Sequence, residues 1–141
     1  MGPRRIGRVP IVDDVHVIAD TLQMIFTRAG YETFAVYSAE EAIELIERTS
    51  WIPEFALLDV NLPGMNGLDL SLWLRTTCPE CAATFLSGDD QTSELLELSA
   101  RCGDLFEVLA KPIHPRDLLG LAAESMPAKK LEAEPELPLL N

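Results

Sequence analysis

Short apolar runs alternate along the chain with longer stretches in which apolar residues recur every three or four positions. The short runs have the length of β-strands, and the longer stretches have the period of amphipathic helices. This alternation is typical of a parallel sheet covered by helices on both faces. The pattern therefore predicts an α/β fold with strands over residues 7–12, 31–36, 55–58, 82–86 and 105–109.

Capping residues mark the helices between these strands. The first predicted helix ends before Gly30, a residue typical of helix C-termini. Ser38 and Glu41 have the spacing of a capping box that opens the second helix. The first helix is expected to present one apolar side made of Val15, Ile18, Leu22, Ile25 and Ala29. The remaining helices are expected over residues 67–76, 90–100 and 115–126.

The length and composition fit one domain followed by a short tail. The chain has 141 residues, of which 48% are hydrophobic, enough for a single core. Residues 1–126 are predicted to form this domain. Residues 127–141 are acidic, contain prolines and show no period, so we expect a disordered tail or a linker.

The charge excludes several classes of partner. A net charge of −12 would repel nucleic acid and anionic membrane surfaces. No apolar segment approaches the roughly 20 residues that span a bilayer, so we expect a cytoplasmic protein with no membrane or direct nucleic-acid contact. Three cysteines do not suggest a disulfide framework, and reduced thiols are expected.

Reactive side chains follow four of the predicted strands, at the point where each strand ends. Asp13 and Asp14 follow the first strand, Asp59 the third, Ser87 the fourth and Lys111 the fifth. The carboxyl ends of parallel strands lie at one edge of the sheet, and such sheets bind their ligands there. We therefore expect these side chains to converge in one pocket.

The residue types in this pocket indicate a metal and a nucleophile. Taken alone, Asp13 and Asp14 could equally be a helix cap. Together with Asp59 they make three carboxylates that repel one another, and Mg²⁺ with its oxygen ligands relieves that repulsion. A carboxylate beside a metal, a hydroxyl and an ammonium is suited to attack phosphorus. Asp59 is therefore the predicted phosphoryl acceptor.

These segments resemble a known family. Asp13-Asp14, the run Leu57-Leu58-Asp59-Val60-Asn61-Leu62-Pro63-Gly64-Met65-Asn66-Gly67, Ser87-Gly88 and Lys111-Pro112 occur in the order of the response-regulator receiver (CheY-like) signature. The resemblance covers about residues 8–124. It implies a flavodoxin-like, doubly wound (βα)5 fold with a five-stranded parallel sheet in the order 2-1-3-4-5.

The resemblance also implies a set of metal ligands. Asp14, Asp59 and the backbone carbonyl of Asn61 would bind Mg²⁺ directly, and Asp13 would act mainly through water. Asn61 and Asp89, each two positions past a key residue, would tune the lifetime of the phosphoaspartate.

Other implied roles concern the phosphoryl group. Ser87 and Lys111 would hold its oxygens, and Gly88 would leave room for it to enter. The Lys111–Pro112 bond would be cis, a state open mainly to proline.

Three positions depart from the family pattern. Val108 stands three residues before the lysine, where the family usually has an aromatic switch residue. How phosphorylation would change the surface of the domain without that residue is therefore an open question. His114 is the second departure. Pro10 is the third, and because it lacks an N–H inside a central strand, a bulge or a shortened strand is expected.

The function implied is a signalling switch. Asp59 would take a phosphoryl group from a phosphohistidine on a histidine kinase or a histidine phosphotransfer protein. Phosphorylation would change the surface of the fourth helix, fifth strand and fifth helix, which would bind a downstream protein of unknown identity. Activated receivers often pair through the fourth and fifth helices, so a homodimer is also possible.

Two other functions stay open. A haloacid-dehalogenase-type phosphatase also uses a strand-end aspartate, Mg²⁺ and lysine, but it requires an aspartate where this chain has Asn61. A pseudo-receiver, suggested by Val108, would bind partners without phosphorylation and would not need Asp59.

Cysteine and histidine residues offer weaker signals. Cys78 and Cys81 have the spacing of a redox or zinc motif, but they follow a helix instead of opening one, and an ordinary loop is expected. His16 and His114 lie off the strand-end group, so surface or capping roles are expected.

Overall fold

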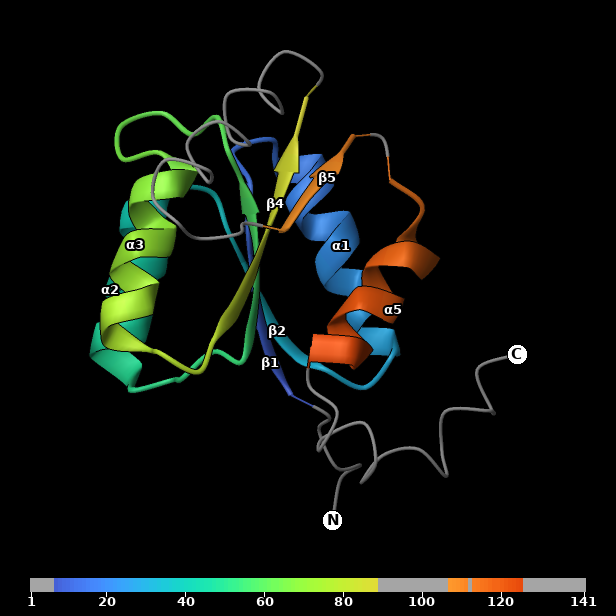
Figure 1. Ribbon diagram of the computed structural model, residues 1–141, viewed down its shortest axis with the longest axis horizontal. Helices are drawn as coiled ribbons and strands as arrows, with labels where there is room; N and C mark the ends of the chain where they lie inside the picture. Colours follow the sequence, from blue (N-terminus) through green and yellow to red (C-terminus); the bar gives the residue numbers. More distant parts are fainter. Residues whose placement is uncertain (1–6, 89–106, 112, 126–141) are drawn as a thin grey trace.

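A computed structural model describes residues 7–88, 107–111 and 113–125. Five parallel strands form one sheet in the order β2-β1-β3-β4-β5, which confirms the predicted fold class and strand order (Figure 1). The strands are β1 (Arg8–Val12), β2 (Glu32–Val36), β3 (Phe55–Asp59), β4 (Ala82–Ser87) and β5 (Glu107–Ala110). The helices are α1 (His16–Arg28), α2 (Ala39–Thr49), α3 (Gly67–Thr77) and α5 (Pro115–Ser125).

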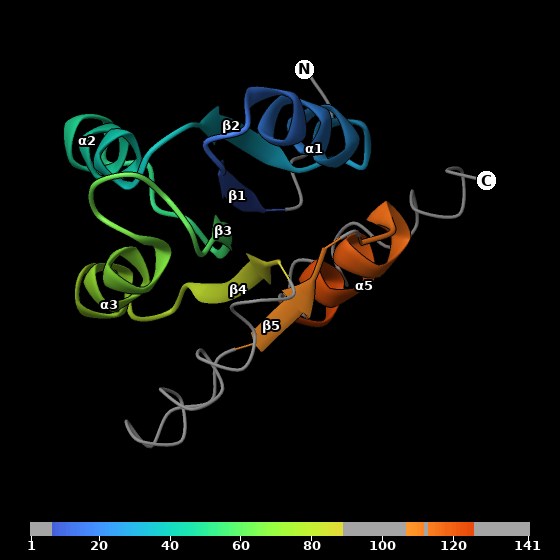
Figure 2. The same cartoon turned by 90° about the horizontal axis from the view of Figure 1, so that it is seen from above.

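The helices cover both faces of the sheet. α1 and α5 lie on one face, and α2 and α3 lie on the other (Figure 2). Each face has its own apolar core, and β3 is buried along its whole length between them. No helix among the described residues is long and apolar enough to cross a membrane. The predicted helix over 90–100 and the predicted tail over 127–141 lie outside the described residues.

The helix ends follow the predicted capping chemistry with two differences. Ser38 Oγ accepts the Glu41 N–H at 3.1 Å, but the Glu41 carboxylate reaches back to the N–H of Tyr37 at 2.7 Å, one residue earlier than in a standard capping box. Val15 precedes α1 as its N-cap residue and is 46% exposed, so it does not belong to the apolar side that was predicted for this helix. Gly30 ends the helix region with a φ of 103°, as its position predicted.

Pro10 shortens a ladder and not the strand. β1 keeps five residues and pairs along all of them with β2, whereas its ladder with β3 begins only at Ile11. The Asp13 N–H donates to β2, and the Arg8 carbonyl accepts from the β3 side, so backbone alternation turns the nitrogen of Pro10 toward β3. Because proline has no N–H to donate, the hydrogen bond that is lost belongs to the ladder between β1 and β3.

Gly67 lets α3 begin directly against the end of β3. A Cβ at this position would overlap the backbone carbonyl oxygen of Asp59 and lie 3.1 Å from its carbonyl carbon. The N–H of Gly67 also donates to the carbonyl of Val60 at 3.1 Å. The absence of a side chain at Gly67 therefore allows α3 to begin close to the strand end that carries Asp59, and the hydrogen bond to Val60 holds it there.

Candidate functional site

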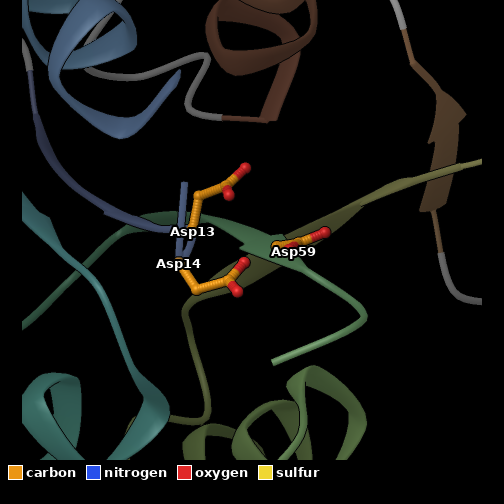
Figure 3. Close-up of side chains that lie close together, drawn as sticks. All are labelled: Asp13, Asp14 and Asp59. Carbon is orange, nitrogen blue, oxygen red and sulfur yellow. The ribbon is translucent and has the colours of Figure 1, made fainter. Parts of the chain in front are cut away.

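Three carboxylates gather at the carboxyl edge of the sheet. Asp13 and Asp14 directly follow β1, and Asp59 is the last residue of the neighbouring strand β3 (Figure 3). One ligand oxygen from each lies within 4.8 Å of the others. Asp13 is 1% exposed and Asp59 is 6% exposed, whereas Asp14 is open to solvent. The predicted convergence of these residues is thus observed, with one carboxylate accessible from outside.

Lys111 balances part of this charge. Its Nζ lies 3.1 Å from Asp13 Oδ2 and 3.1 Å from Asp59 Oδ1, so one ammonium bridges the ends of β1 and β3. The second oxygen of Asp13 accepts the N–H of Val15 at 2.9 Å. Lys111 follows β5 and its backbone N–H donates to the Ser87 carbonyl at 2.8 Å, which fixes where its side chain starts.

The electrostatics of the site disfavour a charged Asp59. Burial, followed by repulsion from Asp13, raises the pKa of Asp59 from 3.8 to about 6, although Lys111 acts in the opposite direction. For Lys111, burial alone would lower the pKa, but the charges of Asp59 and Asp13 outweigh it and raise the pKa overall. One ammonium therefore does not fully compensate the buried carboxylates.

Ser87 and Gly88 lie at the same edge. Ser87 is the last residue of β4 and is fully buried, and its Oγ donates to the Gly88 carbonyl at 2.8 Å. Gly88 is exposed, and an added Cβ there would meet nothing within 4 Å. The structure thus brings Ser87 to the site edge and leaves open space at Gly88, while a contact between the Ser87 hydroxyl and a phosphoryl oxygen stays a prediction.

Asn61 lies in the exposed loop that joins β3 to α3. The carbonyl of Val60 before it accepts the N–H groups of Leu62 at 3.2 Å and Gly67 at 3.1 Å, and Leu62 is buried. Metal binding by the Asn61 carbonyl stays a prediction. Asp89 and the Lys111–Pro112 bond involve residues outside the described part of the chain.

Val108 sits where the family has its aromatic switch residue. It is half-buried on β5, paired with Phe85 of β4, and packs against the core on the α2 and α3 side. The side chain of valine contains neither an aromatic ring nor a hydroxyl group. Any coupling between Asp59 and the outer surface of β5 must therefore proceed without the usual aromatic rotation.

Cys78 and Cys81 belong to a turn. Cys78 ends α3, and the Cys81 N–H donates to its carbonyl at 2.9 Å. Burial raises the pKa of Cys81 to about 12 and also raises that of Cys78, the reverse of what a redox thiolate needs. Within the described residues, the three aspartates are the only cluster able to hold a metal, so these thiols fit the predicted loop.

The two histidines have structural contacts. His16 begins α1 and stacks on Tyr37 with ring centroids 3.7 Å apart. His114 is exposed, and its Nδ1 accepts the Arg116 N–H at 3.0 Å at the start of α5. These contacts agree with the predicted surface and capping roles.

An apolar groove beside the site was not predicted. It has a volume of about 520 Å³ and lies between α1 and α5. Its lining includes Val17 and Leu22 from α1, Leu118 from α5, and Lys111 of the carboxylate site. The apolar residues of α1 gave a signal for one wall, but the second wall comes from α5, almost a hundred residues later in the chain.

Comparisons with known proteins agree on one family. The family model described as response regulator receiver domain matches residues 9–123. The regulatory protein VanR of Enterococcus faecium is 29% identical over 112 residues, which are 79% of this chain and 46% of VanR. The chain thus spans less than half of that relative's length.

Solved structures show the same likeness. A CheY-like receiver domain protein from Methanospirillum hungatei JF-1 has a TM-score of 0.76 and 28% identity, over 92% of this chain and 99% of that one. The receiver domain of AraT, a response regulator from Geobacillus stearothermophilus, has a TM-score of 0.72 and 28% identity, over 93% and 99%.

The electrostatics predict a stabilising substitution. In metal-free buffer at pH 7.5, Asp59→Asn should raise the free energy of unfolding by on the order of 1–3 kcal/mol, because it removes a carboxylate whose raised pKa makes its charged form unfavourable in the fold. The cost of that charge is absent below the ordinary pKa of 3.8 and complete above about 6, so the gain should vanish near pH 4. Urea denaturation at both pH values measures it.

Mg²⁺ provides the control for this prediction. The ion should stabilise the wild-type protein and leave the Asp59→Asn variant nearly unchanged, since binding to the folded state raises stability. A variant that is less stable than the wild type at pH 7.5 would contradict this description of the site.

Proposed function

The chain belongs to the response regulator receiver domain family, and from this membership we propose that it is a phosphorylation switch in which Asp59 accepts a phosphoryl group. The observation that carries the proposal is the bridge of Lys111 between Asp13 and Asp59 beside the open carboxylate of Asp14. This arrangement of two buried carboxylates, an ammonium and an exposed carboxylate supports the roles proposed for Asp59, Lys111 and Asp14.

The donor set fits Mg²⁺. Asp14, Asp59 and the carbonyl of Asn61 would hold the ion, with Asp13 acting through water. Oxygen ligands of this kind suit a hard divalent cation, and the cluster has room for water ligands because Asp14 is exposed. When bound, the ion would neutralise charge on the phosphoryl oxygens.

The transfer step uses the chain's own residues. A carboxylate oxygen of Asp59 attacks the phosphorus of a phosphohistidine, forming a P–O bond as the P–N bond breaks, and the histidine nitrogen keeps the electron pair. Lys111 can then pair with a phosphoryl oxygen in place of the Asp59 oxygen that it now contacts. Ser87 would turn its hydroxyl from the Gly88 carbonyl toward another phosphoryl oxygen.

The phosphodonor is proposed to be a histidine kinase or a histidine phosphotransfer protein. The apolar groove between α1 and α5 reaches Lys111, so a helix that lies in it could bring a phosphohistidine to Asp59. Val17 on the rim of this groove is 71% exposed and available to such a partner.

The output is proposed to be a change in the surface formed by β5, α5 and the helix predicted over 90–100, which would bind a downstream protein or a second copy of the chain. Residues 127–141 would act as a tail or a linker. Val108 favours the alternative of a pseudo-receiver, but the contacts of Asp59 with Lys111 support phosphorylation. A phosphatase is less well supported because Asn61 replaces the second aspartate.

Chemical phosphorylation tests the acceptor directly. After incubation with Mg²⁺ and acetyl phosphate, the intact mass of the wild type should show one added phosphoryl group, and that of Asp59→Asn should show none. Equal addition to both proteins would place the acceptor elsewhere. No addition to the wild type under varied conditions would favour the pseudo-receiver.

The docking groove has a separate test. Val17→Asp should slow phosphotransfer from the fastest donor in a panel of autophosphorylated histidine kinases by about tenfold or more, because it puts a charge into an apolar contact. Its rate with acetyl phosphate should not change. The matched control is Leu72→Asp on α3, where Leu72 is 44% exposed on the opposite face of the sheet. Equal slowing by both variants would contradict the assignment.

A further inference from the structure

The first turn of α2 reaches the loop that follows the phosphoacceptor strand. Glu40 Oε2 accepts a hydrogen bond from the backbone N–H of Met65 at 3.0 Å, across 25 positions of sequence. The side chain of Glu40 is exposed, so burial alone does not force it into this position. Met65 belongs to the same loop as Asn61, the predicted carbonyl ligand of the metal.

The loop is shaped to receive this carboxylate. Gly64 has a φ of 76°, a conformation that residues with a side chain rarely adopt. A Cβ at Gly64 would lie 2.8 Å from Glu40 Oε2, so any other residue would displace the carboxylate. The hydrogen bond from the Met65 N–H lowers the pKa of Glu40, because an N–H donor favours the charged carboxylate.

Tyr37, two residues before α2 begins, contacts α1. Tyr37 donates from its hydroxyl to Asp20 Oδ1 at 2.7 Å and stacks on His16, two residues after Asp14. Glu41 accepts the Tyr37 N–H at 2.7 Å and so fixes that residue to α2. Tyr37 therefore contacts the helix that follows Asp14, and Glu40, three residues later, contacts the loop that follows Asp59.

Other contacts anchor the loop as well: the side chain of Met65 packs against the α2 and α3 core, and Asn66 Oδ1 accepts the Asp69 N–H at 2.8 Å. Leu62 is buried in the α2 and α3 core, and Gly67 donates to Val60 at the start of α3. Between these anchors the loop is half-buried or exposed, and Glu40 contacts it there. A side chain of α2 thus restrains the same loop at Met65, four positions after Asn61.

We propose that Glu40 is a positioning residue for the magnesium site, and this inference rests on the proposed function. Through Met65 it would hold the β3–α3 loop, and with it the Asn61 carbonyl, in the position that the proposed metal site requires. Glu40 acts on the loop and not on the metal itself. Its loss should therefore weaken metal binding without changing the carboxylate cluster.

Three variants test the proposal. Glu40→Ala removes the acceptor, Glu40→Gln keeps an acceptor oxygen without the charge, and Glu47→Ala removes an exposed carboxylate from the same helix. Mg²⁺ affinity is measured by calorimetric titration, and the exchange rate of the Met65 amide is measured by NMR in the metal-free protein. The exchange measurement reports on the bridge even where no metal is bound.

Glu40→Ala should weaken Mg²⁺ binding about three- to tenfold and speed exchange of the Met65 amide about tenfold, as loss of a hydrogen bond to a charged group would do. Glu40→Gln should stay within about twofold of the wild type, and Glu47→Ala should match it.

Four results would overturn parts of this account. Unchanged affinity in Glu40→Ala would contradict the positioning role, and so would unchanged exchange of the Met65 amide. An equal loss of affinity in Glu40→Gln or in Glu47→Ala would show a general charge effect instead of a bridge. A wild-type protein that does not bind Mg²⁺ would instead contradict the proposed function.

Discussion

The structure depends on how negative charge is balanced at one edge of the sheet. Three carboxylates meet there, and the ammonium of Lys111 contacts the two that are buried, Asp13 and Asp59. The sum of these four charges is −2, which matches a divalent cation. Burial, followed by repulsion from Asp13, raises the pKa of Asp59, and a bound divalent cation would relieve that repulsion.

The fold brings the carboxylates together and also brings Lys111 to the same edge, where its ammonium offsets part of their negative charge. Parallel order brings the ends of β1 and β3 side by side, so Asp13 and Asp59 meet although 46 positions separate them. The backbone bond from Lys111 to Ser87 fixes the end of β5 against β4, so the ammonium is delivered to the same edge. Gly67 allows α3 to start directly against the backbone of Asp59. The geometry on which the proposed switch depends is therefore a consequence of strand order and of a few close backbone contacts.

Much of this could be predicted from the sequence because parallel strands share an edge. Asp13, Asp59 and Lys111 each follow an apolar run, so their convergence required only the strand order. Strand ends were less certain, since Asp59 and Ser87 proved to belong to the strands they were expected to follow. Val15 was misplaced because its apolar side chain fits the helical period, although the helix begins one residue later.

Other features had no local signal. The contact of Glu40 with Met65 depends on a flexible side chain and a distant loop, and the pattern of α2 explains Glu40 simply as an exposed residue. The groove beside Lys111 depends on how α1 and α5 pack together. The hydroxyl direction of Ser87 is a rotamer choice that sequence patterns do not encode.

The most direct measurement is an NMR titration of the Asp59 carboxyl carbon with and without Mg²⁺. Without the ion, we expect a pKa near the value of about 6 that burial and Asp13 impose. With Mg²⁺ bound, the pKa should fall by roughly one to three units, because the cation favours the charged carboxylate. A pKa near 4 without the ion, or a pKa that Mg²⁺ does not change, would contradict the view that charge imbalance at this edge prepares Asp59 for metal binding and phosphorylation.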